Sequence, residues 1–114
     1  MQEFSIVMND EPGALAVHCE AIAANGANIL AIAGVGSDDA RIAVITDDED
    51  ATRLALNTMN ANYSTSPVLT RELPHKPGAL ADFCREMGDS GTNLHSLYIL
   101  SMGEDAATIG YTTD

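Results

Sequence analysis

The 114-residue sequence is poor in aromatic and in basic residues. It has no tryptophan, and aromatic residues make up only 4% of the chain, so a core must be built mainly from alanine, isoleucine, leucine and valine. Five lysines and arginines stand against 17 aspartates and glutamates, giving a formal net charge of −12. Binding to nucleic acid or to an anionic membrane surface is disfavoured, because both depend on clustered basic side chains. A charge of this sign also suits a salt-rich cytoplasm.

Several sequence features that mark other protein classes are missing. No apolar run reaches the ~18 residues that a membrane-spanning helix needs. The start, Met-Gln-Glu-Phe, lacks the basic region of a signal peptide, so we expect a soluble, cytoplasmic protein. Cys19 and Cys84 form no Cys-x-x-Cys motif, and we expect both to be buried on the inner faces of helices. With no nucleophile–base pair and no phosphate loop, we predict no enzyme activity, no cofactor and no metal site.

The chain contains one sequence unit twice. Glu-Pro-Gly-Ala-Leu-Ala at residues 11–16 returns as Lys-Pro-Gly-Ala-Leu-Ala at residues 76–81, an offset of 65 residues. Three further identities hold at the same offset: Cys19 with Cys84, Gly26 with Gly91, and Asn28 with Asn93. Such self-similarity indicates two related modules. We place them at residues 1–67 and 68–114.

The apolar periodicity of the first copy predicts the order strand, helix, strand, strand, helix, strand. We expect strands at about 3–8, 28–35 and 41–46, a helix at about 12–25, a helix capped by Asp47 or Asp48 that ends near residue 60, and a last strand from Tyr63. The inner stripe of the second helix is predicted to be Ala51, Leu54, Ala55, Thr58 and Met59. This order predicts an α+β, ferredoxin-like βαββαβ fold with both helices on one face of an antiparallel sheet.

The second copy is shorter than the first. It shows a helix at about 77–89 and strands at about 93–101 and 107–113, and then the sequence stops at Asp114. The second copy is therefore predicted to be truncated to βαββ, which leaves one sheet edge and part of one face uncovered. Association with another copy of the chain, or a sequence cut short in this region, would each account for this. We favour association, and hence a homodimer or larger homo-oligomer.

These motifs resemble the ACT domain. Both copies have a strand, a turn, Pro-Gly-Ala-Leu opening a helix, and Gly-x-Asn opening an apolar strand, at residues 12–28 and 77–93. The pairing is similar to stand-alone tandem ACT proteins, which carry no catalytic domain. The resemblance implies a small ligand, usually an amino acid, held between modules near the first turn. It also implies regulation of an enzyme or reporting of metabolite levels, and modules associated side by side.

The first residues of the repeated helix form a candidate ligand site. Pro12 fits the first helical position, which would make Glu11 the capping residue, and glutamate is a poor N-cap. Backbone donors are then free to bind a carboxylate, with the positive end of the helix behind them. In the first copy these donors are the N–H groups of Gly13, Ala14 and Leu15. Asp10, or carbonyl groups near Asn28, would accept the ammonium group of an amino acid.

The second copy offers the same donors in an opposite electrostatic setting. Its donors are the N–H groups of Gly78, Ala79 and Leu80. His75 and Lys76 replace Asp10 and Glu11 beside them, so we predict that the second copy is the better anion site. The alternative is that water satisfies these donors and Pro-Gly only shapes a turn. Asn93, like its counterpart in the first copy, is expected mainly to hydrogen-bond turn backbone, with ligand contact secondary.

The sequence thus predicts a sensor or regulatory protein that binds an amino acid or a similar small carboxylate and acts on an enzyme. The alternative is a ligand-free module whose exposed sheet edge builds an oligomer or docks a partner protein. A small enzyme of ferredoxin-like fold is the weakest reading.

Overall fold

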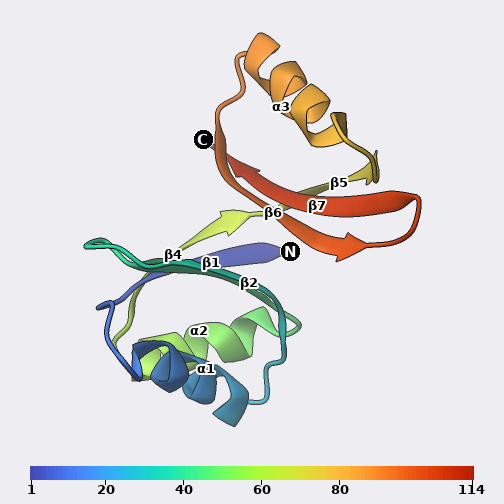
Figure 1. Ribbon diagram of the computed structural model, residues 1–114. Helices are drawn as coiled ribbons and strands as arrows, with labels where there is room; N and C mark the ends of the chain where they lie inside the picture. Colours follow the sequence, from blue (N-terminus) through green and yellow to red (C-terminus); the bar gives the residue numbers. More distant parts are fainter. The chain divides into compact units, whose positions relative to one another are not determined.

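The computed structural model describes residues 1–114, which form two compact units: unit 1 (Met1–Ser66) and unit 2 (Pro67–Asp114) (Figure 1). Unit 1 contains β1 (Gln2–Val7), α1 (Ala14–Ala24), β2 (Ile29–Val35), β3 (Arg41–Thr46), α2 (Glu49–Thr58) and β4 (Asn62–Pro67). Unit 2 contains β5 (Leu69–Pro74), α3 (Ala79–Asp89), β6 (Leu94–Met102) and β7 (Ala106–Thr113). Only Val68 separates β4 from β5, as the extended stretch around Pro67 predicts. No helix is long and apolar enough to cross a membrane.

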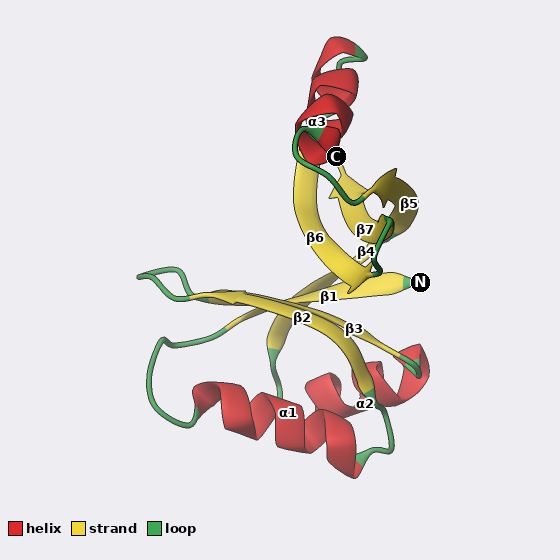
Figure 2. Cartoon of the chain, turned by 45° about the vertical axis from the view of Figure 1, so that its right-hand side comes forward, coloured by secondary structure: helices red, strands yellow, loops and turns green.

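Unit 1 is a four-stranded sheet in the order β2-β3-β1-β4, with α1 and α2 on one face (Figure 2). β3 pairs antiparallel with both β1 and β2, and Phe4 lies opposite Val44 while Ile6 lies opposite Ile42. Because side chains alternate along a strand, these four residues share the face that the helices cover. The core also takes in Ile22, Ala27, Ala55 and Leu56. The predicted ferredoxin-like arrangement is confirmed.

Unit 2 is a three-stranded antiparallel sheet in the order β5-β7-β6, with α3 as its one helix (Figure 2). The order matches β1-β3-β2 of unit 1, so the predicted βαββ truncation is confirmed. The core is small: Phe83, Ile109 and Tyr111 are buried, and the rings of Phe83 and Tyr111 meet edge to face at 5.1 Å between centroids. Four partly buried side chains surround this cluster: Leu73, Met87, Leu94 and Leu97.

The start of α1 differs from the prediction. Gly13 is the N-cap, in a left-handed conformation at φ 90°, and the Ala14 N–H donates to the Glu11 carbonyl oxygen at 3.2 Å. Proline followed by a residue of positive φ is typical of a type II turn, which requires glycine at its third position. Pro12 therefore belongs to a turn before the helix, and Glu11 is not the cap. The second copy repeats this geometry, with Gly78 at φ 91° as the N-cap of α3.

The buried faces of the helices are also shifted from the predicted ones. α3 buries Ala79 and Phe83, whereas Cys84 is exposed. Cys19 is only half-buried. The prediction of two buried cysteines is therefore wrong for Cys84. The reason is that the helix starts at the residue after the glycine, and residues at four-residue spacing from that first residue face the sheet.

The inner stripe of α2 is likewise corrected. Leu54 is 60% exposed, whereas Thr52, Ala55 and Leu56 are buried. Asp48 is the N-cap, as predicted for one of two aspartates, and its side chain accepts the Ala51 N–H at 3.0 Å. The Thr52 hydroxyl lies 2.7 Å from the Thr46 hydroxyl on β3, which fixes that side of the helix against the sheet.

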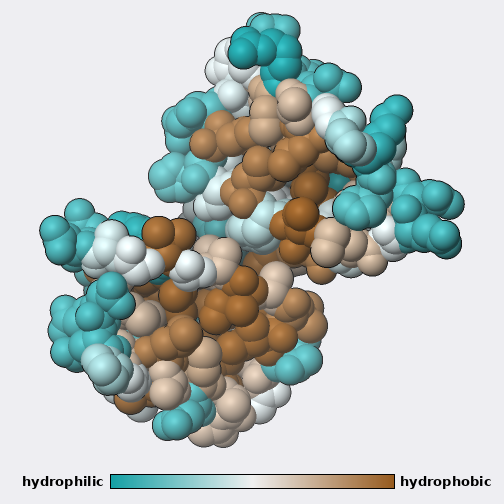
Figure 3. Space-filling model, in the orientation of Figure 1, coloured by the Kyte–Doolittle hydropathy of each residue, from teal (hydrophilic) through white to brown (hydrophobic).

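Strand β2 is an edge strand with exposed apolar side chains. The sequence predicts that it is buried on both faces or faces a partner, and within the chain it is not buried. Leu30 is 57% exposed and Val35 is 73% exposed. In the space-filling view, hydrophobic surface gathers on the side of unit 1 where α1 and β2 lie (Figure 3).

Candidate functional site

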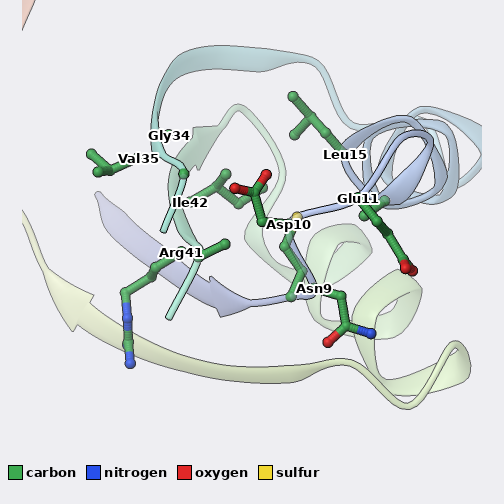
Figure 4. A pocket seen from close by; sticks show the side chains of 12 residues that line it. Asn9, Asp10, Glu11, Leu15, Gly34, Val35, Arg41 and Ile42 are labelled. Carbon is green, nitrogen blue, oxygen red and sulfur yellow. The ribbon is translucent and has the colours of Figure 1, made fainter. Parts of the chain in front are cut away.

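Unit 1 has a hollow of about 220 Å³ beside the N-terminus of α1 (Figure 4). It lies between the loop after β1, the first turn of α1, the end of β2 and the start of β3. Its walls are formed by Met8–Glu11, Ala14, Leu15, Gly34–Gly36 and Ala40–Ile42. Leu15, Val35 and Ile42 make part of this wall apolar. The hollow therefore combines an apolar surface with the polar end of a helix.

Asp10 is the charged side chain that points into this hollow, whereas Asn9, Glu11 and Arg41 point away from it (Figure 4). The close approach of Asp10 to the end of β2 depends on Gly36. A Cβ atom built on Gly36 would lie 2.9 Å from a carboxylate oxygen of Asp10, so a larger residue would displace this side chain. A carboxylate held in a hollow is an acceptor for an ammonium group or another hydrogen-bond donor.

Backbone donors stand beside the hollow. No side chain caps α1, and the first hydrogen bond that returns to the cap is from the Val17 N–H to the Gly13 carbonyl oxygen at 3.0 Å. The predicted set of free donors is wrong for Ala14, whose N–H already serves the turn. The N–H of Leu15 has no acceptor in the chain. Free N–H groups at the start of a helix attract anions, because the helix dipole adds to their positive charge.

The structure brings only part of the predicted first-copy site together. Asp10, Glu11, Ala14 and Leu15 line the hollow, and Gly13 adjoins them as the cap. Asn28 lies before the start of β2, whereas the hollow adjoins the end of that strand. The Asn28 N–H donates to the Asp47 carboxylate at 2.8 Å.

The sequence prediction missed the residues on β2 and β3 that close the hollow. Gly34 and Gly36, separated by one residue, were the available signal. Glycine within or beside a strand often marks a place where another group approaches the backbone closely.

The residues predicted in the second copy are more dispersed. Lys76 and Ala79 line a different hollow, of about 420 Å³, on the flank of α3. The His75 N–H donates to the Asp105 carbonyl oxygen at 2.9 Å. Asn93 bonds the Asp114 carboxylate through its side-chain amide at 2.8 Å. Gly78 is the N-cap of α3, and Leu80, next along that helix, is 41% exposed.

The acidic run at residues 47–50 has a structural role in the described fold. Asp48 caps α2, and Asp47 binds the backbone of Asn28 through both its own N–H and its side chain. Glu49 and Asp50 lie in the first turn of α2, where the helix dipole favours negative charge. No group of three or more histidine, cysteine, aspartate or glutamate side chains is arranged to hold a metal ion.

The two cysteines are expected to differ in reactivity. Burial raises the pKa of the Cys19 thiol, and the neighbouring Glu20 carboxylate raises it further, whereas Cys84 is exposed. Because the thiolate is the reactive form, Cys19 should be alkylated more slowly than Cys84 near neutral pH. Timed iodoacetamide labelling with peptide mass spectrometry measures both rates in one sample. Faster labelling of Cys19 would contradict the burial seen here.

Comparison by sequence gives no matching family model and no matching curated protein. Comparison by structure gives clear likenesses. A protein from Bacteroides thetaiotaomicron superposes with a TM-score of 0.83 at 22% identity, over 99% of this chain and 78% of that one. The ligand-free regulatory subunit of aspartate kinase from Thermus thermophilus superposes with a TM-score of 0.71 at 15% identity, over 97% of this chain and 82% of that one.

A third likeness is to part of a larger enzyme. Aspartate kinase from Clostridium acetobutylicum, described as an allosteric enzyme, has a TM-score of 0.62 at 11% identity, and the match covers 97% of this chain but only 29% of the kinase. Identities this low show the fold alone. The chain has an ACT-like, ferredoxin-type fold that is similar to regulatory subunits of aspartate kinase.

Proposed function

We propose that this chain is an ACT-type regulatory module that binds a small α-amino acid in the hollow of unit 1. The observation that carries the proposal is the Asp10 carboxylate, which points into a partly apolar hollow beside the uncapped N-terminus of α1. The ligand's ammonium group would bond Asp10, and its carboxylate would bond the free N–H groups at the helix start. The likeness to regulatory subunits of aspartate kinase supports a regulatory role.

The size and walls of the hollow favour a small ligand. Its volume of about 220 Å³ is below the range typical of drug-sized ligands. Leu15, Val35 and Ile42 would contact an apolar side chain. A zwitterion also meets the charge pattern better than a simple anion, because Asp10 repels a carboxylate that brings no positive charge with it.

The exposed edge of unit 1 suggests how ligand binding is reported. Val35 both lines the hollow and belongs to the edge strand β2, where Leu30 and Ile32 are also exposed. We propose that a second copy of the chain covers this edge, so that ligand and association are linked. A ligand shifts such an equilibrium only through different affinity for the two states. The regulated partner would be an enzyme, and we assign no catalytic activity to the chain itself.

A ligand-free oligomerisation module is the second candidate. It is favoured by the same exposed apolar edge, since an unpaired strand edge readily pairs with another chain. Sedimentation at micromolar concentration, with and without ligand, distinguishes the two candidates. A dimer whose stability responds to no amino acid would support this second candidate and overturn the sensor.

The sensor is tested by thermal unfolding with each of the twenty amino acids. A ligand at about 100 times its dissociation constant should stabilise the protein by about 2.7 kcal/mol. Asp10→Asn should remove the response, whereas Asp39→Asn, an exposed change in the β2–β3 turn, should leave it intact. Lys76→Gln tests the predicted preference for the second copy. If Lys76→Gln removes the response and Asp10→Asn does not, the site lies in unit 2 and the present assignment is wrong.

A further inference from the structure

Unit 2 has an uncovered surface at the place where α2 packs in unit 1. The two units match at an offset of 65 residues, so Phe4 and Ile6 on β1 correspond to Leu69 and Arg71 on β5. With α2 in place, Phe4 and Ile6 are fully buried. In unit 2, Leu69 is 50% exposed. We call this region the helix-docking surface, formed by Leu69, Arg71, Leu73, Ala79 and Phe83.

A hollow of about 420 Å³ lies on this surface, against the flank of α3. Unit 1 has an equivalent hollow beside Ala14 and His18, the counterparts of Ala79 and Phe83, and residues 59–62 close it there. Those residues are the C-terminal end of α2 and the start of β4. Unit 1 therefore provides a direct template: a helix fills this position, and its C-terminal end points toward the start of the neighbouring helix.

The aromatic ring at this surface is covered by a basic side chain. The Arg71 guanidinium lies 5.0 Å from the centre of the Phe83 ring and forms an ion pair with Glu86. In unit 1 the corresponding cover comes from α2 itself, whose Arg53 guanidinium lies 5.6 Å from the centre of the Phe4 ring. Phe83 thus keeps a partial cover in the absence of a second helix, and the apolar surface around it stays open.

Charges along the surface distinguish it from the one that α2 occupies. Asp82 lines the hollow, and the equivalent residue of α1 is Val17. Lys76 also lines it, where the first copy has Glu11. Neither Asp82 nor Lys76 has an ion-pair partner in the chain. A helix docked like α2 would have its negative C-terminal end near Lys76, which is favourable. It would have its flank beside Asp82, which favours a basic residue there.

We propose that this surface docks an amphipathic helix of a partner protein that carries small apolar residues on its inner stripe and basic residues on the flank facing α3. The chain's own α2 fits less well, because its first turn carries Glu49 and Asp50 and its one basic residue is Arg53. The net charge of −12 disfavours a second copy of this acidic chain and favours a basic partner.

The test uses the full chain and two stapled helical peptides. Both keep the inner residues of α2, namely Ala51, Thr52, Ala55, Leu56 and Met59, and their outer positions are all lysine in one and all glutamate in the other. The basic peptide is expected to bind more tightly and to shift amide NMR signals of α3 and β5. Asp82→Lys should weaken its binding by about two- to fivefold, the size expected for an exposed ion pair. Glu104→Lys, an equal charge change in the β6–β7 turn, should weaken it less.

Three results would overturn the proposal. Equal weakening by Asp82→Lys and Glu104→Lys would show that the peptide responds only to net charge. Shifts outside α3 and β5, or no binding of either peptide, would show that this surface docks no helix. Concentration-dependent shifts of α3 and β5 without peptide would show that a second copy occupies the surface. The amino-acid response of unit 1 is a separate measurement, so its failure would leave this result unaffected.

Discussion

Leu56→Ala is expected to lower the free energy of unfolding by about 2–5 kcal/mol. Leu56 is fully buried and belongs to the core cluster that α1, α2 and the sheet of unit 1 share. Removing its side chain loses buried apolar contacts and leaves a cavity among Phe4, Ile22 and Ala55 that the packed core fills only partly. Urea unfolding followed by circular dichroism, with wild-type and variant at one protein concentration, measures the change.

Leu54→Ala is the matched control on the same helix. Leu54 is 60% exposed, so the same chemical change there should alter the unfolding free energy by no more than about 0.5 kcal/mol. The pair also tests the rotation of α2, since the sequence pattern placed Leu54 on the inner stripe. Equal losses in the two variants would mean that the helix packs with a different face against the sheet.

Phe83→Ala is expected to cost about 3–5 kcal/mol and to remove most of the stable structure of unit 2. The ring packs edge to face on Tyr111, covers Ile109 and carries the Arg71 guanidinium on its face. Unit 2 buries only a small core, and small units have little stability to spare. Hydrogen exchange of the full chain should show that the amides of β7 lose their protection.

Leu80→Ala on α3 provides the comparison for that variant. Leu80 is 41% exposed and lies outside the buried cluster, so its removal should leave the exchange of β7 close to that of wild type. Retained protection in Phe83→Ala would show that the three buried residues are not what holds unit 2 together.

The candidate site was only partly predictable. The repeated Pro-Gly-Ala-Leu located the start of α1 and Asp10 correctly, because a turn before a helix is encoded within a few adjacent residues. The closing wall could not be found this way, since Gly34–Gly36 and Arg41 reach the hollow through strand pairing across the sheet. The predicted role of Asn28 failed for the same reason, because that residue lies at the other end of β2.

The sequence by itself determined the order of strands and helices, the duplication at an offset of 65 residues and the shortened second copy. These follow from local periodicity and from turn residues, which act over a few neighbouring positions. Only the tertiary structure decided which helix faces are buried. Gly13 and Gly78, in the left-handed conformation, start each helix one residue after the glycine, and packing against the sheet then selects Phe83 over Cys84. Tertiary packing also decided that Asp10 points into a hollow and that Leu69 lies open where Phe4 is buried, because both depend on residues distant in the chain.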